Sequence, residues 1–473
     1  MATLVKYGDI HCHPTLRPFG QTIDGIHYSE PKDKGSIWYY DPPCFTDKIF
    51  ENLAGVSKYS QSNYTAAVKG NMLLIGTSLY APEVAFFENR LGEGPIAHEL
   101  ENIVTGFGIK RIKEIESESY DYFEDINGQY NFLKSLDGHK VRIGKKLYSY
   151  RLISSFSELE DIEKENEQIV AVFINMEGGH GFGCGKDPKE HPADPEVVMK
   201  NLESMLAWKH KPFYITMAHH FYNELLGHTK SIPDELKNII DQSYGMDTGI
   251  TDLGYRVIRK ILEPGNNVLI DVKHMSTRSR EQFYHLIDTE YSNRKLPLIF
   301  SHGGVNGLPD FSYAGTHVDG SLFNEDSISL FDDEIGRIVK SNGIIGLNID
   351  QRVMASKIAR KDVKGKILCS SKYYSWSSLI WNNIRYIAEY LDRHDLPSWD
   401  NICFGTDYDG AINPVNYFWT YEEMPRFHRY LRKHISEYLR TCKLKNENRI
   451  PPDEIAKKIM GGNLREFLKN NFS

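Results

Sequence analysis

The stretch QIVAVFINMEGGHG, residues 168–181, is the clearest indication of the fold class of this chain. It begins with an almost unbroken apolar run, and an acidic residue, Glu177, follows directly. A strand that is covered on both faces has such a composition, whereas a strand with one wet face alternates apolar and polar residues. The stretch therefore predicts a parallel strand buried inside an α/β protein, with Glu177 at its carboxyl end.

Similar apolar runs recur along the rest of the chain. They lie near residues 4–10, 71–80, 212–218, 267–272, 296–301, 343–349 and 401–406. Helical segments separate many of them: one begins at Thr251, a natural N-cap, and ends at Pro264-Gly265, and another ends at Gly343. Eight strands that alternate with helices predict a (β/α)8 TIM-type barrel. An open doubly wound sheet is the alternative, but no glycine-rich phosphate loop follows any of these runs.

Two stretches interrupt the regular alternation of strands and helices. Residues 20–68 are polar and rich in tyrosine, and residues 110–166 carry dense charge of both signs. We interpret both as long insertions after early strands of one barrel domain that spans residues 1–473. Because strand-to-helix loops of a barrel lie on its catalytic face, the first insertion is expected to overhang that face.

Composition limits the classes of partner and the compartment. The chain has 473 residues and a formal net charge of −8, which argues against nucleic acid or an anionic membrane as the main partner. No stretch approaches the roughly 20 apolar residues of a membrane span, and no apolar signal segment precedes the first strand. The six cysteines are scattered without a CxxC pair, which favours reduced thiols and a cytoplasmic location.

Metal-ligand residue types stand at the ends of six of the eight predicted strands. They are His11 and His13, Glu177, His219 and His220, His274, His302, and Asp407 and Asp409. The carboxyl ends of barrel strands meet on one face, and imidazole and carboxylate are ligands that Zn²⁺ accepts. Each residue alone is compatible with a buried structural role, but their coincidence on one face favours a metal site.

The order of these motifs resembles that of the metal-dependent amidohydrolase superfamily. Within it, the chain is most similar to the membrane (renal-type) dipeptidases, peptidase family M19. The stretches that carry the resemblance are HCH at 11–13, INMEGGHG at 174–181, GITDLGYRVI at 249–258, LIDVKHMS at 269–276, PLIFSHGG at 297–304, FGTDYDG at 404–410 and IMGGNLREFL at 459–468. The resemblance covers almost the whole chain apart from the two insertions.

The resemblance implies a site with two zinc ions. His11, His13 and Glu177 would hold the first ion, and Glu177, as a bridging carboxylate, would hold the second with His274 and His302. Two cations that share a water make hydroxide available near neutral pH.

The resemblance also implies roles for residues that hold no metal. Asp407 would accept the proton of the attacking water and deliver it to the leaving amine, and His219 would stabilise the oxyanion. His220 is expected to point elsewhere, while His180 and Asp409 either orient ligands or are structural. The implied substrate is a small dipeptide-like molecule, and a homodimer is compatible with the family.

The sequence departs from the family in two places. The family's first motif has histidine followed by aspartate, so His13 makes the first metal site less anionic and weaker. The family also places an arginine after the sixth-strand histidine to bind the substrate carboxylate, but residues 303–336 contain no Arg or Lys. Lys273, Arg278 and Arg352 are candidates to replace it.

The sequence is compatible with three functions. The first is a dipeptidase-type hydrolase, and the second is an amidohydrolase that acts on a non-peptide amide, lactone or ester. The third is a non-catalytic metal-binding barrel, which Asp407 argues against because a binding module needs no proton shuttle.

Overall fold

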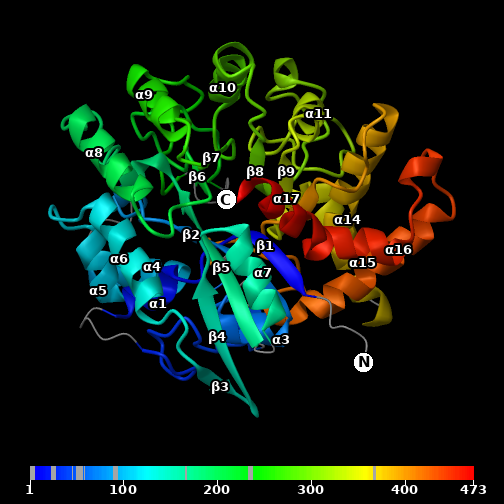
Figure 1. The fold of residues 1–473 in the computed structure, drawn as a ribbon, viewed down its shortest axis with the longest axis horizontal. Coiled ribbons are helices and arrows are strands. Elements are labelled where there is room, and N and C mark those ends of the chain that lie inside the picture. Colours follow the sequence, from blue (N-terminus) through cyan, green and yellow to red (C-terminus); the bar gives the residue numbers. More distant parts are fainter. Residues whose placement is uncertain are drawn as a thin grey trace.

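A computed structural model shows the barrel that the sequence predicts (Figure 1). It describes residues 6–22, 28–44, 46–48, 57, 59–88, 94–165, 168–232, 238–365 and 369–473. Parallel strands lie side by side in the order β1 (Tyr7–Cys12), β2 (Met72–Leu79), β5 (Gln168–Glu177), β6 (Tyr214–Thr216), β7 (Leu269–Asp271), β8 (Ile299–Gly303), β9 (Ile344–Leu347) and β10 (Ile402–Phe404). Every predicted strand is thereby confirmed.

The first and last strands of this order are held together by hydrogen bonds. Beyond the end of β10, the Asp407 N–H donates to the His11 carbonyl at 3.0 Å. The buried carboxylate of Asp9, a residue of β1, accepts three further hydrogen bonds. The donors are the Thr406 N–H at 3.0 Å, the Thr406 hydroxyl at 2.5 Å and the Tyr421 hydroxyl at 2.6 Å. Asp9 therefore links β1 to the segment that follows β10.

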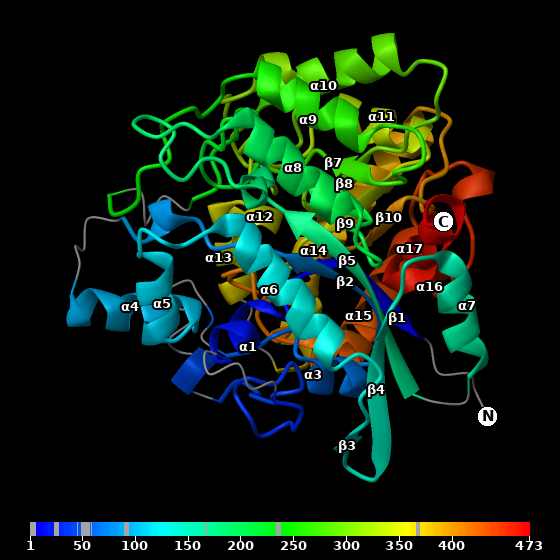
Figure 2. The same cartoon turned by 60° about the vertical axis from the view of Figure 1, so that its left-hand side comes forward.

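Helices surround the strands and cover their outer faces (Figures 1 and 2). The helices between the later strands are α8 (Pro195–Leu206), α9 (Asp252–Ile261), α10 (Thr277–Glu290), α11 (Asp332–Lys340), α12 (Gln351–Met354), α13 (Lys357–Gly365) and α14 (Cys369–Arg393). The Thr251 side chain caps α9 by accepting from the Gly254 N–H, as predicted. The expected stop at Gly343 is shifted: α11 ends at Lys340, and Asn342 takes the left-handed conformation with φ +57°.

The insertion predicted at 110–166 contains regular structure. Its helices are α5 (Ile109–Ile115), α6 (Tyr122–Ser135) and α7 (Phe156–Lys164), with α4 (Pro95–Thr105) and the short helix η1 (Val84–Phe86) before them. It also holds a hairpin, β3 (Val141–Ile143) and β4 (Lys146–Leu152). Ala171 of β5 pairs with Leu74 of β2 on one side and with Arg151 of β4 on the other. The strand β4 therefore lies along the first part of the β5 edge that faces β6. On that edge β6 pairs with Met176 and Glu177, at the carboxyl end of β5. Figure 2 shows this hairpin extending beyond the barrel.

Further helices precede β2 and follow β10, and the last of them packs against β1. Helices α1 (Leu16–Gly20) and α3 (Tyr64–Lys69) follow β1, and α15 (Met424–Leu439), α16 (Pro452–Lys457) and α17 (Asn463–Asn471) follow β10. Between α16 and α17, Gly461 has φ +154°, and a Cβ there would lie 2.7 Å from the Gly8 nitrogen. The glycines of the motif at 459–468 thus let the C-terminal helices approach β1. Among the described helices, none is both long and apolar enough for a membrane span.

Candidate metal centre

Glu177, the last residue of β5, lies at the centre of five histidines. Its Oε1 is 3.4 Å from Nε2 of His11, 3.4 Å from Nε2 of His274 and 3.5 Å from Nε2 of His302. Its Oε2 is 3.0 Å from Nε2 of His13 and 3.6 Å from Nε2 of His219. The carboxylate and all five imidazoles are buried. The structure therefore brings together every predicted metal ligand, and His219 with them.

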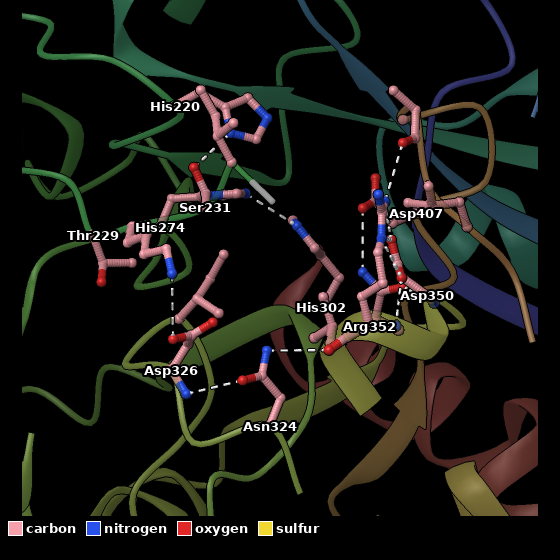
Figure 3. A pocket seen from close by; sticks show the side chains of 18 of the residues that line it. His220, Thr229, Ser231, His274, His302, Asn324, Asp326, Asp350, Arg352 and Asp407 are labelled. Carbon is pink, nitrogen blue, oxygen red and sulfur yellow. Dashed lines mark hydrogen bonds and ion pairs between the residues drawn. The ribbon is translucent and has the colours of Figure 1, made fainter. Parts of the chain in front are cut away.

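The spacing of these atoms suits a metal ion. Two ligand atoms at about 2.1 Å from a tetrahedral zinc lie about 3.4 Å apart, and the distances around Glu177 are close to that value. His274 Nε2 and His302 Nε2 are 3.2 Å apart (Figure 3). In addition, His11 Nε2 and Glu177 Oε1 are buried and have no hydrogen-bond donor or acceptor as partner in the described chain. Such atoms are costly unless a cation satisfies them, so the residues fit a metal.

More than one set of three ligands converges at this centre. The ligand atoms of His11, His13 and Glu177 lie within 4.8 Å of one another, and so do those of Glu177, His219 and His274. A third set consists of His11, His302 and Asp407. The arrangement can thus accommodate a shared carboxylate with histidines on either side.

Neutral oxygens hold the two histidines of the first strand. His11 Nδ1 is 2.8 Å from the Tyr214 hydroxyl and 2.9 Å from the Ser78 hydroxyl. His13 Nδ1 donates to the Ser78 carbonyl at 3.1 Å. With its proton on Nδ1, His11 can present the Nε2 lone pair towards Glu177, as a metal ligand requires. His13 can do the same once a metal displaces the proton on its Nε2.

In two histidines of the later strands, the Nδ1 atom is linked to a carboxylate, directly or through a hydroxyl. His219 Nδ1 is 2.6 Å from Glu83 Oε2. His302 Nδ1 is 2.8 Å from the Ser301 hydroxyl, which donates to Asp271 at 2.6 Å. These partners fix the ring orientation and increase the basicity of Nε2.

The electrostatics of the centre differ from one residue to the next. Burial lowers the pKa of His219 and of His274 to about 3, so both rings are neutral near pH 7. Burial also acts to lower the pKa of His13, but its hydrogen bonds to Asp407 and Glu177 raise it to about 10. Burial acts to raise the pKa of Glu177, yet the surrounding histidines hold it well below its usual range. Glu177 is therefore a carboxylate.

Asp407 and Asp409, which follow β10, face different surroundings. Asp407 has φ +59°, its Oδ1 is 3.5 Å from His13 Nε2, and its Oδ2 accepts from the Asn348 amide at 3.2 Å. Asp409 instead accepts from the Gln61 N–H at 3.0 Å and the Ser62 hydroxyl at 2.6 Å. Asp407 thus lies at the edge of the centre, and Asp409 anchors the end of the first insertion.

The remaining strand-end histidines lie around His219. His180 Nε2 is 2.8 Å from the Ala81 carbonyl, and its ring centroid is 6.2 Å from that of His219. His220, which was expected to point elsewhere, lines the cavity with its ring 5.3 Å from that of His274. Its Nδ1 is 2.6 Å from the Ser231 hydroxyl (Figure 3).

Two solved structures are similar to this chain over 99% of its length and 99% of theirs. One is a metallopeptidase from Rhodobacter sphaeroides bound to a phosphinate mimic of the dipeptide L-Ala-D-Ala, with a TM-score of 0.57 and 12% identity. The other is a dipeptidase AC described as a metallopeptidase of family M19, with a TM-score of 0.56 and 12% identity. The fold is that of the M19 dipeptidases. No protein-family model and no curated protein sequence matches the chain.

A cavity of 1340 Å³ opens over the centre of this M19-type barrel. Its walls come from the loops after the strands, including residues 229–232, 314–318 and 348–360. Within the described part of 20–68, no residue lines the cavity, so the expected overhang of the first insertion is not seen there.

Lys273 and Arg352 line the cavity, whereas Arg278 does not. Lys273 is buried, donates to the Ile328 carbonyl at 3.4 Å, and has a pKa that burial lowers to about 8. Arg352 Nε donates to both Asp350 oxygens at 3.0 Å (Figure 3). The carboxylate of Asp350 thus already neutralises the guanidinium.

Ser78 and Glu83 orient three histidines of the centre, and neither was predicted as a site residue from the sequence. Both stand at the end of the second strand, one of the two strand ends to which no role was assigned. A carboxylate placed shortly after a barrel strand was the signal that would have found Glu83.

Proposed function

We propose that this protein is a metal-dependent hydrolase of the dipeptidase type that cleaves the amide bond of a small dipeptide-like substrate. The observation that carries the proposal is the convergence of histidine Nε2 atoms on the Glu177 carboxylate. A fold shared with a metallopeptidase that binds a dipeptide mimic supports it. In this proposal His11, His13, Glu177, His274 and His302 hold two zinc ions.

The chemistry divides between the metals and the chain. Bound zinc supplies Lewis acidity and makes hydroxide available near pH 7. Asp407 takes the proton of the attacking water and delivers it to the leaving amine, and Asn348 holds that carboxylate in place from the opposite oxygen.

His219, neutral at rest, is proposed to stabilise the oxyanion from Nε2 in its protonated form, whose charge Glu83 would balance. Its place in a set with Glu177 and His274 makes ligation the competing role. His219→Ala is expected to lower turnover about 10²- to 10³-fold and to leave the metal content unchanged. A fall in bound metal would instead assign His219 as a ligand. His191→Ala, at an exposed histidine, is the matched control.

A second candidate function is hydrolysis of a non-peptide amide, lactone or ester. The absence of Arg and Lys from residues 303–336 and the neutralisation of Arg352 by Asp350 favour it. A non-catalytic metal-binding barrel is disfavoured by the position of Asp407 beside His13.

Metal analysis of the purified protein, followed by a substrate panel, tests the proposal. The panel contains L,L- and L,D-dipeptides, non-peptide amides, lactones and esters. Two zinc ions per chain and metal-dependent hydrolysis of a dipeptide are expected. Hydrolysis of non-peptide substrates alone would establish the second candidate, and metal binding without hydrolysis of any of them would indicate the non-catalytic barrel.

A further inference from the structure

The cavity is larger than a dipeptide needs. Sites for drug-sized ligands typically measure roughly 300–1,000 Å³, and this cavity measures 1340 Å³. A dipeptide of small residues is smaller than such ligands. Much of the space above the metal centre therefore remains available to another part of the substrate.

The two sides of the cavity differ in chemistry. Apolar side chains dominate on the loops after β1, β2 and β6, where outside the metal centre the charged lining residues are Glu101, Lys230 and Asp247. The apolar ones are Leu16, Pro82, Phe86, Phe87, Leu100, Phe107, Ile232, Ile239, Ile240 and Met246. The loops after β7 to β10 also carry apolar residues, such as Phe323, Ile328 and Ile358, but they hold most of the charged lining residues, among them Lys273, Asp350 and Arg352.

The apolar side includes one residue beside the metal centre and one at the protein surface. The Phe86 ring centroid lies 5.0 Å from that of His220, whose ring is next to His274. The Phe87 and Phe107 rings, which are both buried, are 6.5 Å apart. Leu100 on α4, which is 45% exposed, also lines the cavity. We call Phe86, Phe87, Leu100 and Phe107 the acyl wall. Helix α4 stands at the periphery of the barrel (Figure 2).

We infer that the acyl wall binds a long apolar acyl chain, so that the substrates are N-acyl amino acids with extended hydrocarbon chains. This inference rests on the proposed hydrolase function and specifies its substrate class. The acyl half would lie along the wall, and the amino-acid half would face the charged side, where Lys273 and Arg352 lie. Water adds to the amide carbonyl, the C–N bond breaks, and the products are a fatty acid and a free amino acid, whose nitrogen takes the proton.

A chain-length series tests the inference. The zinc-loaded protein is assayed with N-acetyl-, N-hexanoyl- and N-decanoyl-alanine and with Ala-Ala as the benchmark. Because burial of each methylene favours binding about fourfold, we expect kcat/KM to rise by at least about tenfold from acetyl to decanoyl. Leu100→Asp, at the rim of the wall, should flatten this rise. Leu147→Asp, at a leucine that is 49% exposed on β4 and outside the cavity, should leave it unchanged.

The outcomes separate this inference from the proposed function. Hydrolysis of Ala-Ala without a rise along the acyl series, or a rise that Leu100→Asp does not alter, would overturn the acyl wall and leave the hydrolase intact. If no compound is hydrolysed, the proposed function fails. Titration calorimetry with N-acetyl- and N-decanoyl-alanine then tests whether the acyl wall binds a long acyl chain. Binding of the decanoyl compound at least about tenfold more tightly, and loss of that gain in Leu100→Asp, would support the wall. Equal affinities would overturn it.

Discussion

The β1 half of the metal centre, His11 and His13, differs from the β6–β8 half, His219, His274 and His302, in what stands behind the imidazoles. Hydroxyl and carbonyl oxygens of Tyr214 and Ser78 hold the β1 half. In the β6–β8 half, Glu83 holds His219 directly and Asp271 reaches His302 through Ser301. His274 Nδ1 has no hydrogen-bond partner among the described residues.

Histidines of the same centre can therefore bind a metal with different affinity, because the groups that accept from their Nδ1 atoms differ. A carboxylate behind an imidazole raises its basicity more than a neutral oxygen does. We therefore expect the β6–β8 half to retain a metal when the β1 half has lost its own. We expect the proposed first site to be the weaker one, both because His13 adds no charge and because no carboxylate accepts from its Nδ1.

The largest effect is expected from the residue that both halves share. Among the described residues, Glu177 is the one carboxylate that all five histidines face, so Glu177→Ala should abolish binding of both proposed metals. Because a Lewis acid contributes several kcal/mol to such reactions, activity should fall by about 10³-fold or more. Metal analysis and steady-state kinetics measure the change, with Glu203→Ala, at an exposed position, as control. Full metal content in Glu177→Ala would contradict the proposed bridging role.

The second largest effect is expected at Asp407, beside His13, where a substitution should lower turnover without removing metal. Asp407→Asn should keep both metals while turnover falls about 10²- to 10⁴-fold, because the proton acceptor is lost. Asp400→Asn, at an exposed carboxylate, is the control. If Asp407→Asn hydrolysed the best substrate at the wild-type rate, the assigned mechanism would be wrong even with the metals in place.

Two substitutions, one in each half, test whether the β6–β8 half binds metal more tightly than the β1 half. Asp271→Asn keeps a hydrogen-bond acceptor for Ser301, which holds the proposed ligand His302, but removes the charge, and it should weaken metal binding about 10- to 100-fold. Ser78→Ala removes only the hydroxyl near His11 and leaves the carbonyl that holds His13, so its effect should be smaller. Competition with a chelator measures both affinities. A greater loss in Ser78→Ala would reverse the proposed order of the two halves.

The smallest effect concerns the substrate carboxylate. Asp350 already neutralises Arg352, and the nearby Asp407, Asp271 and Glu177 carboxylates balance the Lys273 ammonium. We therefore expect weak discrimination, below about tenfold, between a dipeptide and its amide, since a charge-assisted partner is missing. A large preference for the free acid that disappears in Lys273→Met would assign the carboxylate to Lys273 and restore the plain dipeptidase interpretation.

The barrel strands could be predicted because burial on both faces leaves continuous apolar runs. The hairpin β3–β4 could not, because it lies at the outer end of β5, where Lys146 and Leu147 are exposed and no such run forms. The ligand candidates could be predicted because one fold places all strand ends on one face. The hydroxyl partner Ser78 could not, since it meets His11 only after β1 and β2 pair. The direction of His220 likewise depends on Ser231, which the sequence does not place beside it.

Asp9 has a consequence for the order of folding. Its carboxylate contacts Thr406 and Tyr421, so the ring of strands closes through contacts between residues about 400 positions apart in the chain. Contacts of such long range form slowly because the intervening chain must first be ordered. His11 and His13 leave the ribosome first, yet they meet Asp407 only after β10 has been synthesised and docked. The metal centre is therefore completed at the end of folding, and a bound metal would mark chains whose barrel has closed.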